Sequence, residues 1–200
     1  MALAEADSGY GIDLAAIKDE VQKTLSPLDE ARHLPGEIYT SPEVLALEKE
    51  RMFMKDWLCM ARLEEIENPG DYITFRVLDE PVLIARAEDG EVNAFANVCR
   101  HRGVEVATGQ GNVKEFSCPY HGWLYDLKGH LQGVPFMKNV KDYDFQNCRL
   151  KTLRTAVWAG FIFISFNPDV EALEDYVKDF DNAFGLLKME ECRLADKLVA

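Results

Sequence analysis

Cys99-Arg100-His101 and Cys118-Pro119-Tyr120-His121 are two short segments separated by sixteen residues, and each contains one Cys and one His. Two thiolates and two imidazoles form the ligand set of a [2Fe-2S] centre in which His replaces Cys on one iron. The spacing therefore predicts that Cys99 and Cys118 hold one iron and that His101 and His121 hold the other. We expect such a cluster to carry single electrons.

Strand signals surround both segments. Residues 92–98 are predicted to lead into the first segment, residues 116–118 into the second, and residues 123–125 away from it. Further strands are predicted at 72–78, 82–87, 153–158 and 161–165, with turns at Asn68-Pro69-Gly70 and at Glu88-Asp89-Gly90-Glu91. The ligand pairs therefore lie on loops of a mainly β scaffold, an arrangement that suits a surface electron-transfer site.

Helices flank this scaffold. Ser41 and Pro42 have the chemistry of an N-cap and a first helical residue, and the helix that they begin is predicted to end near Lys55. Its buried face is predicted to comprise Leu45, Met52, Phe53 and Trp57. A second helix follows Asn167-Pro168, with one apolar face made of Leu173, Tyr176, Val177, Phe180 and Phe184.

The pattern divides the chain into three parts. Residues 1–40 are predicted to form an N-terminal arm with a short helix at 14–25, and residues 41–167 the cluster domain with its leading helix. Residues 168–200 are predicted to form a linker helix and the start of a truncated further domain, because a strand pattern begins at Cys192 without a partner.

Bulk composition limits the classes of protein. With 200 residues and 48% hydrophobic residues, the chain can build a real core. The acidic start lacks the features of a signal peptide, and no stretch reaches the roughly 18 apolar residues of a membrane span. We therefore expect a cytoplasmic protein that is not bound to a membrane. In that compartment Cys59, Cys148 and Cys192 are predicted to be reduced, mostly buried thiols.

Charge is unevenly distributed. The chain carries a net charge of -13, whereas residues 99–154 hold nine Lys or Arg and five Asp or Glu. Overall acidity argues against nucleic acid as a partner, and the basic segment is predicted to steer an acidic redox partner toward the cluster. The alternative is that its cations simply solvate a loop and a strand: Lys138, Lys141, Arg149, Lys151 and Arg154.

The segments 97–103 (Asn-Val-Cys-Arg-His-Arg-Gly) and 118–123 (Cys-Pro-Tyr-His-Gly-Trp) resemble the cluster loops of Rieske non-haem iron oxygenases. The resemblance is strongest to the α subunits of aromatic-ring-hydroxylating dioxygenases, and it runs from about Leu34 to the end of the chain. It also includes Tyr125-Asp126, Gly129, Gly36-Glu37-Ile38-Tyr39 and Gly133-Val134-Pro135. It implies a Rieske-type antiparallel β fold with an N-terminal and a C-terminal helix.

The resemblance also implies a function. In that family a Rieske domain takes electrons from a ferredoxin or reductase and passes them to a mononuclear iron, which activates oxygen to hydroxylate an aromatic substrate. It implies a homotrimer, in some members with a β subunit. Arg102, Tyr120 and Trp123 are predicted to surround the cluster, with a solvated loop residue and two core aromatics as the alternative interpretation.

The histidines of this chain do not match the pattern that the family uses for its mononuclear iron. A mononuclear site needs two His and one carboxylate, and only His33 and His130 remain after the cluster ligands. Both are predicted to be exposed, and they do not form the close pair that the family uses. We therefore expect no catalytic residue here, with the non-haem Fe(II) in a missing C-terminal domain.

Two alternative functions stay open from sequence. The first is a free-standing Rieske ferredoxin-like electron carrier, against which the flanking helices argue. The second is a zinc-binding interaction module, since Cys and His also suit zinc. Gly109-Gln110-Gly111 lacks the third glycine of a dinucleotide-binding loop and is predicted to be a turn.

Overall fold

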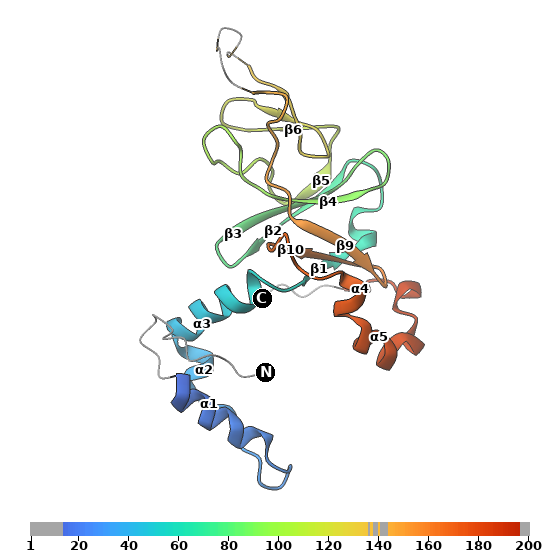
Figure 1. Ribbon diagram of the computed structural model, residues 1–200. Coiled ribbons are helices and arrows are strands. Elements are labelled where there is room, and N and C mark those ends of the chain that lie inside the picture. The colour runs from blue at the N-terminus through green and yellow to red at the C-terminus, as the bar shows by residue number, and fades with distance from the viewer. Residues whose placement is uncertain (1–13, 136, 138–139, 141–143, 197–200) are drawn as a thin grey trace. The chain divides into compact units, whose positions relative to one another are not determined.

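The computed structural model describes residues 14–135, 137, 140 and 144–196 (Figure 1). The described chain divides into two compact units, one up to Met54 and one from Lys55 onward. Among the described residues, no helix is both long and apolar enough to cross a membrane.

The first unit is helical. It contains α1 (Leu14–Gln22), η1 (Lys23–Leu25), α2 (Glu37–Thr40), α3 (Pro42–Glu48) and the π-helical turn η2 (Lys49–Phe53). The Ser41 hydroxyl accepts a hydrogen bond from the Val44 N–H at 3.2 Å, which confirms the predicted cap of α3. The predicted buried face is wrong for Leu45 and Met52, which are exposed. The α-helix ends at Glu48 and the chain continues as a π-helical turn, so the 3.6-residue spacing that placed Met52 on the predicted face does not hold there.

Three antiparallel sheets build the second unit, and Figure 1 shows them following one another along it. One sheet has the order β4-β3-β2-β5, a second the order β1-β10-β9, and a third the order β6-β7-β8. Their bounds are β1 (Leu58–Arg62), β2 (Asp71–Val77), β3 (Glu80–Arg86), β4 (Val92–Ala96), β5 (Gln110–Asn112), β6 (Phe116–Ser117), β7 (Leu124–Tyr125), β8 (Leu131–Gly133), β9 (Arg154–Trp158) and β10 (Phe161–Ser165). The predicted mainly β fold is confirmed.

Strands β1, β5 and β8 were not predicted from sequence. The predicted turn at Gly109-Gln110-Gly111 is half right: Gly109 turns the chain at φ +69°, but Gln110–Asn112 pairs with β2. All three residues of β5 are exposed, so the strand lacks the hydrophobic alternation that reveals a strand in sequence.

The core of the second unit joins the β4-β3-β2-β5 sheet to the loops of the β6-β7-β8 sheet. Leu83, Phe95 and Tyr125 are fully buried in one cluster with Trp123 and Leu150. The same cluster includes the buried sulfurs of Cys99 and Cys118. The two candidate ligand cysteines therefore belong to this core.

The C-terminal helical segment is broken. It consists of α4 (Leu173–Tyr176), α5 (Lys178–Phe184), η4 (Gly185–Leu187) and η5 (Met189–Glu191). Leu173 and Val177 pack with Trp57 in a second apolar cluster. The Trp57 indole N–H donates to the Glu171 carbonyl at 2.9 Å. The predicted single helix is divided at Val177, although Tyr176, Val177 and Phe180 still line one apolar pocket. Three aromatic members of the predicted face stay about half exposed: Tyr176, Phe180 and Phe184.

Two further expectations are corrected. Residues 192–196 adopt no regular secondary structure, so the predicted strand from Cys192 does not form in the part of it that the structure describes. Cys59 and Cys192 are exposed and Cys148 is half-buried, which contradicts their predicted burial; all five cysteines are free. The domain limits at residues 40 and 167 stay predictions, beside the division at Met54.

Candidate metal centre

The two candidate ligand loops have the same backbone design. The Gly103 N–H donates to the Cys99 carbonyl and the Gly122 N–H to the Cys118 carbonyl, each at 2.9 Å. Each Cys N–H in turn donates to the carbonyl one residue beyond that glycine, at 2.8 Å. Both glycines have positive φ, +74° and +69°, a backbone conformation that side chains other than glycine disfavour. The repeated turn presents one Cys and one His from each loop.

The loops bring the imidazoles together. The ring centroids of His101 and His121 are 4.7 Å apart, in an edge-to-face arrangement. Trp123 stacks on His101 with centroids 4.8 Å apart and only 8° between the planes. Tyr120 covers His121 at a centroid distance of 3.8 Å. The His121 ring nitrogen Nδ1 is buried and has no hydrogen-bond partner among the described residues. The lone pair of this nitrogen is therefore available to a metal.

The two thiols are buried beside each other. Cys99 and Cys118 are each 3% exposed. Burial raises the pKa of the Cys118 thiol; a backbone N–H of Tyr120 counteracts this rise and the neighbouring Cys99 adds to it. A buried pair of neutral thiols gains from a metal that displaces both protons. Desolvation lowers the pKa of His101, which keeps its imidazole in the neutral form that binds metals.

Tyr125 links the first loop to the core. Its hydroxyl lies 3.3 Å from the Cys99 sulfur and accepts a hydrogen bond from the Arg100 N–H at 3.0 Å. Burial, followed by the hydrogen bond to Cys99, raises the pKa of Tyr125, so the phenol stays protonated. With a thiolate at Cys99 the phenol is the donor in this contact.

Asn97 closes the first loop from inside. This side chain is 1% exposed; its oxygen accepts from the N–H groups of Val106 and Ala107 at 3.0 and 3.1 Å. Its amide donates to the Ala107 carbonyl at 2.7 Å. Val106 and Ala107, which follow the candidate ligands Cys99 and His101, are thereby tied to Asn97, which precedes them.

The donor set fits a two-iron cluster better than a single ion. Within the described part of the chain, no three His, Cys, Asp or Glu side chains gather as a mononuclear site requires. A [2Fe-2S] cluster makes a different demand, since each iron takes only two protein ligands and shares the sulfides. Two buried thiols, two adjacent imidazoles and an unpartnered Nδ1 fit that demand.

The other predicted site residues have clear positions. Arg102 is exposed beside His101. Tyr120 is 54% exposed, so the core-aromatic interpretation is wrong for this residue, whose ring lies over His121 at the surface of the domain. Trp123 is 2% exposed, so the core-aromatic interpretation is right, and the same ring also stacks on a candidate ligand. His33 is exposed as predicted, whereas His130 is half-buried with Nδ1 3.3 Å from an Asp126 oxygen.

Sequence reasoning missed two residues of this site, Tyr125 and Asn97. Tyr125 entered only as part of a strand and a motif, although a buried Tyr usually needs a hydrogen-bond partner. Asn97 entered only as part of a motif, although an amide at the end of an apolar strand is a signal for loop closure.

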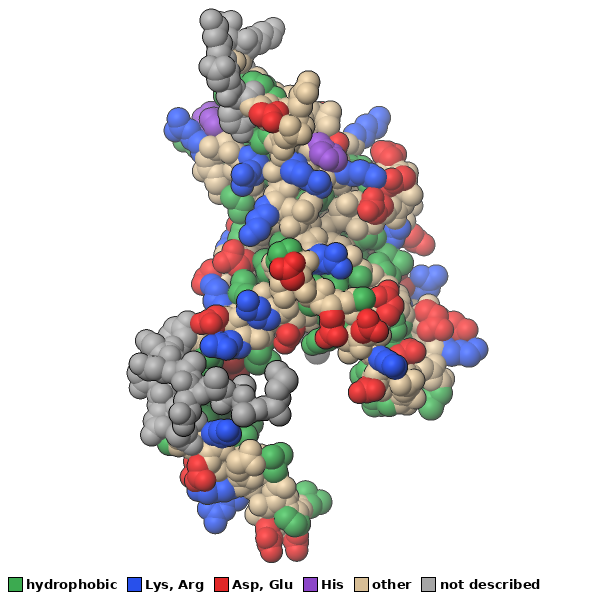
Figure 2. Space-filling view, in the orientation of Figure 1, with side chains coloured by type: hydrophobic (Ala, Val, Ile, Leu, Met, Phe, Trp, Pro, Cys, Tyr) green, Lys and Arg blue, Asp and Glu red, His purple; other side chains and the backbone are tan. Residues whose placement is uncertain are grey.

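The basic segment is less uniform than its composition indicates. Lys128 is paired with Asp89 at 2.6 Å and Glu91 at 3.0 Å, so its charge is locally balanced. Figure 2 shows Lys and Arg side chains beside the visible histidines in the upper part of the molecule, and acidic side chains around the lower right. Lys138 and Lys141 lie outside the described residues.

Comparison with known proteins gives a consistent result. The family model of the Rieske [2Fe-2S] domain matches residues 56–144. The carnitine monooxygenase oxygenase subunit of Acinetobacter baumannii is 36% identical over 176 residues, which is 86% of this chain and 47% of that protein. The chlorobenzene dioxygenase subunit alpha of Cupriavidus sp. (strain PS12) is 37% identical over 142 residues, which is 70% of this chain and 32% of that protein.

Solved structures agree with the sequence relatives. The apo form of a quaternary ammonium Rieske monooxygenase superposes with a TM-score of 0.71 at 36% identity, covering 79% of this chain and 48% of that one. Naphthalene 1,2-dioxygenase from Rhodococcus sp. gives a TM-score of 0.76 at 33% identity, covering 86% and 40%. The chain spans less than half the length of the relatives that it matches.

Proposed function

The chain carries a Rieske [2Fe-2S] domain homologous to that of Rieske oxygenase large subunits, and on this premise we propose that it relays single electrons from a redox partner to an oxygen-activating iron. The observation that carries the proposal is the buried, unpartnered Nδ1 of His121 beside His101, Cys99 and Cys118. In this proposal the two sulfurs hold one iron and the two imidazoles hold the other.

Ligand chemistry suits this relay. Two neutral imidazoles leave the cluster less negative than four thiolates would, so the cluster accepts an electron more readily. Rieske centres have potentials of roughly -150 to +300 mV, against about -400 mV for plant-type ferredoxins. A ferredoxin or reductase is therefore a thermodynamically suitable donor. The role of this chain's residues is to hold the cluster, bury its thiolate side and fix its imidazoles near the surface.

The activity proposed for the whole protein is that of an oxidoreductase that incorporates oxygen. We propose that oxygen chemistry occurs at a mononuclear Fe(II) in the part of the large subunit that corresponds to the unmatched length of the relatives. The free-standing carrier is disfavoured because similarity to the glycine betaine monooxygenase oxygenase subunit of Chromohalobacter salexigens extends over 95% of this chain. That length goes far beyond the matched Rieske domain at residues 56–144.

Two substrate classes have support. We propose ring hydroxylation of an aromatic compound, as the resemblance to dioxygenase α subunits implies and as the name of the chlorobenzene relative supports. A quaternary ammonium compound is the second candidate, supported by the names of the carnitine and glycine betaine relatives. A homotrimer with or without a β subunit and a cytoplasmic location are part of the same proposal.

Single-turnover chemistry of the full-length subunit tests the proposal. The protein is loaded with iron and sulfide, reduced, and mixed with ¹⁸O₂ and either an aromatic acid or carnitine. We expect a Rieske-type electron paramagnetic resonance signal that disappears as labelled product forms, with one or two labelled atoms distinguishing monooxygenation from dioxygenation. A colourless protein containing one zinc and no iron would instead establish the zinc module.

A further inference from the structure

One buried guanidinium holds three separate parts of the chain together. Arg62 is the last residue of β1, and its guanidinium donates to the Ala159 carbonyl at 3.1 Å, in the turn between β9 and β10. The same guanidinium donates to the carbonyls of Met189 and Cys192, at 3.2 and 2.6 Å. One side chain therefore connects the end of β1, the turn between β9 and β10, and the segment that follows α5.

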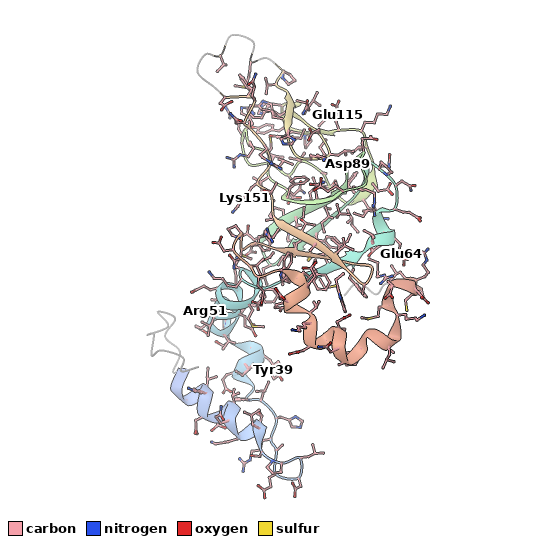
Figure 3. All side chains as sticks on the ribbon, turned by 45° about the vertical axis from the view of Figure 1, so that its right-hand side comes forward. Tyr39, Arg51, Glu64, Asp89, Glu115 and Lys151 are labelled. Atoms are coloured by element: carbon pink, nitrogen blue, oxygen red, sulfur yellow. The ribbon has the colours of Figure 1, made fainter. Side chains whose placement is uncertain are left out.

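Glu64 adds two contacts to that segment. It lies in the 3-10 turn η3 (Leu63–Ile66), directly after β1, and its carboxylate accepts from the Leu194 N–H and pairs with Arg193 at 3.0 Å. The Leu194 N–H, followed by Arg193, lowers the pKa of Glu64, so the carboxylate stays charged near neutral pH. Figure 3 shows Glu64 at the side of the β sheets that borders the C-terminal helical segment.

We propose that Arg62 and Glu64 are positioning residues that fix segment 189–194, and with it the junction between the Rieske domain and the rest of the large subunit. The proposal rests on the electron-relay function above. In that function one electron passes from the reduced cluster to an iron in a C-terminal domain, and segment 189–194 lies on the path of the chain toward that domain. The junction then sets the distance that the electron crosses.

The surroundings of Arg62 are shaped for its guanidinium. Arg62 is 9% exposed, and its guanidinium lies 4.5 Å from the centroid of the Phe161 ring. Gly160 in the facing turn has φ +78°, and a Cβ atom there would lie 2.8 Å from a guanidinium nitrogen. The Arg62 Nε is buried without a hydrogen-bond partner among the described residues, which makes this burial costly. A buried charge is weak evidence for stability, but three directed hydrogen bonds define one geometry.

The segment itself contributes little packing. From residue 178 to residue 196 every residue is exposed except Met189, which is half-buried and lines an apolar pocket beside Phe161. Side-chain burial therefore holds this stretch at one residue, and the hydrogen bonds from Arg62 and Glu64 to its backbone supply further fixed points. Loss of either side chain should free the stretch and leave the sheets folded.

The two positioning residues lie away from the candidate cluster. They belong to β1 and η3, whereas the candidate ligand loops follow β4 and β6, in the other two sheets. Figure 1 shows β1 and β6 far apart along this unit. Because electron transfer slows steeply with distance, a displaced junction would slow the transfer to the iron while the potential of the cluster stays the same.

Hydrogen exchange of the cluster-loaded full-length subunit tests whether the segment is fixed in this way. The variants are Arg62→Met and Glu64→Ala. The matched control is Glu67→Ala, because Glu67 has no hydrogen bond or ion pair with segment 189–194 in the part of the chain that the structure describes. We expect faster amide exchange over this segment in both variants and wild-type exchange in the control, since local opening exposes the amides.

Single-turnover kinetics of the same proteins test the positioning role. Each is reduced with dithionite and mixed with oxygen and an aromatic acid or carnitine, and the loss of the cluster resonance signal is followed. We expect Arg62→Met and Glu64→Ala to slow this loss about tenfold, since a misplacement of about 1 Å far from the reacting centre can cost up to about 10²-fold in rate. Glu64→Gln keeps an acceptor for the Leu194 N–H and should restore most of the rate.

The cluster itself provides the second control, because its potential, its resonance signal and its reduction by dithionite should be the same in wild type and variants. Wild-type exchange in both variants, or wild-type turnover despite faster exchange, overturns the positioning role while the relay stands. An altered signal or a loss of iron in Glu64→Ala also overturns it. A wild-type cluster that stays reduced with oxygen and either substrate overturns the relay itself. If Arg62→Met does not fold, the Glu64→Ala result decides.

Discussion

The Tyr125 hydroxyl lies 3.3 Å from the Cys99 sulfur, inside the core that joins the candidate cluster loops to the β4-β3-β2-β5 sheet. A hydrogen bond to a thiolate becomes stronger as the cluster gains an electron, because the sulfur then carries more negative charge. A hydrogen bond to a charged group is worth roughly 1.5–3 kcal/mol, and part of this energy differs between the two redox states.

Tyr125→Phe is expected to lower the cluster potential. If the redox-dependent part of the hydrogen bond is about 1 kcal/mol, the change is roughly 40 mV for one electron. A redox titration followed by electron paramagnetic resonance measures it. Tyr72→Phe removes the hydroxyl from another tyrosine, one that contacts the Thr108 carbonyl, and serves as the control. Equal potentials for wild type and Tyr125→Phe would contradict the role of the hydroxyl.

Cys118→Ala is expected to abolish the cluster, because one iron would keep a single protein ligand. Iron and acid-labile sulfide analysis of the full-length subunit measures the loss. Cys59→Ser is the control, since Cys59 is exposed on β1 and should leave about two irons per chain. Full iron content in Cys118→Ala would contradict the ligand assignment.

Trp123→Leu is expected to lower the iron content and alter the resonance signal of the cluster, because the indole ring that stacks on His101 is lost. Truncating a fully buried Trp costs about 3–5 kcal/mol for alanine, and somewhat less for leucine. Trp123→Phe keeps an aromatic face and should restore most of the iron content and the shape of the resonance signal. If Phe and Leu variants share the same altered signal, the stacking contact has no specific effect on His101.

The turns of the two candidate ligand loops could be predicted from sequence because they depend on adjacent residues. Cys, His and Gly occur at fixed spacing within each loop, and a turn of five residues needs no distant information. The contacts across the core could not be predicted in this way: Cys99 meets Tyr125, and His101 meets Trp123, only after the two loops fold against each other.

For the helices, the start of a helix could be predicted from sequence but the burial of its residues could not. The cap of α3 was predictable from Ser41 and Pro42, since a cap is set by adjacent residues. The burial of its apolar residues was not, because burial depends on what packs against the helix. Met52 is 53% exposed although the pattern places it on the apolar face. The break at Val177 is of the same kind, since Val177 is buried with Trp57 from a distant segment.

Asn97→Ala is expected to destabilise the first ligand loop. Its oxygen satisfies two backbone N–H groups, and each buried donor left without a partner costs about 1–3 kcal/mol. We expect a loss of roughly 3 kcal/mol in the free energy of unfolding and faster bleaching of the cluster absorbance. Asn97→Asp keeps the acceptor oxygens and should bleach more slowly than Asn97→Ala. Equal bleaching rates for wild type and Asn97→Ala would exclude loop closure as the role of this side chain.

Gly129→Ala is expected to disturb the core beneath the cluster loops. Gly129 has φ +81°, and a Cβ atom there would lie 2.6 Å from a ring carbon of the fully buried Phe95. The left-handed conformation costs about 1–2 kcal/mol for a residue with a side chain, and the clash adds to it because Phe95 has no room to move. Gly109→Ala is the matched control, because Gly109 has φ +69° but no atom within 4 Å of the added Cβ. Thermal unfolding should therefore show a larger decrease in Tm for Gly129→Ala than for Gly109→Ala, and equal decreases would mean that backbone conformation alone accounts for the glycine at position 129.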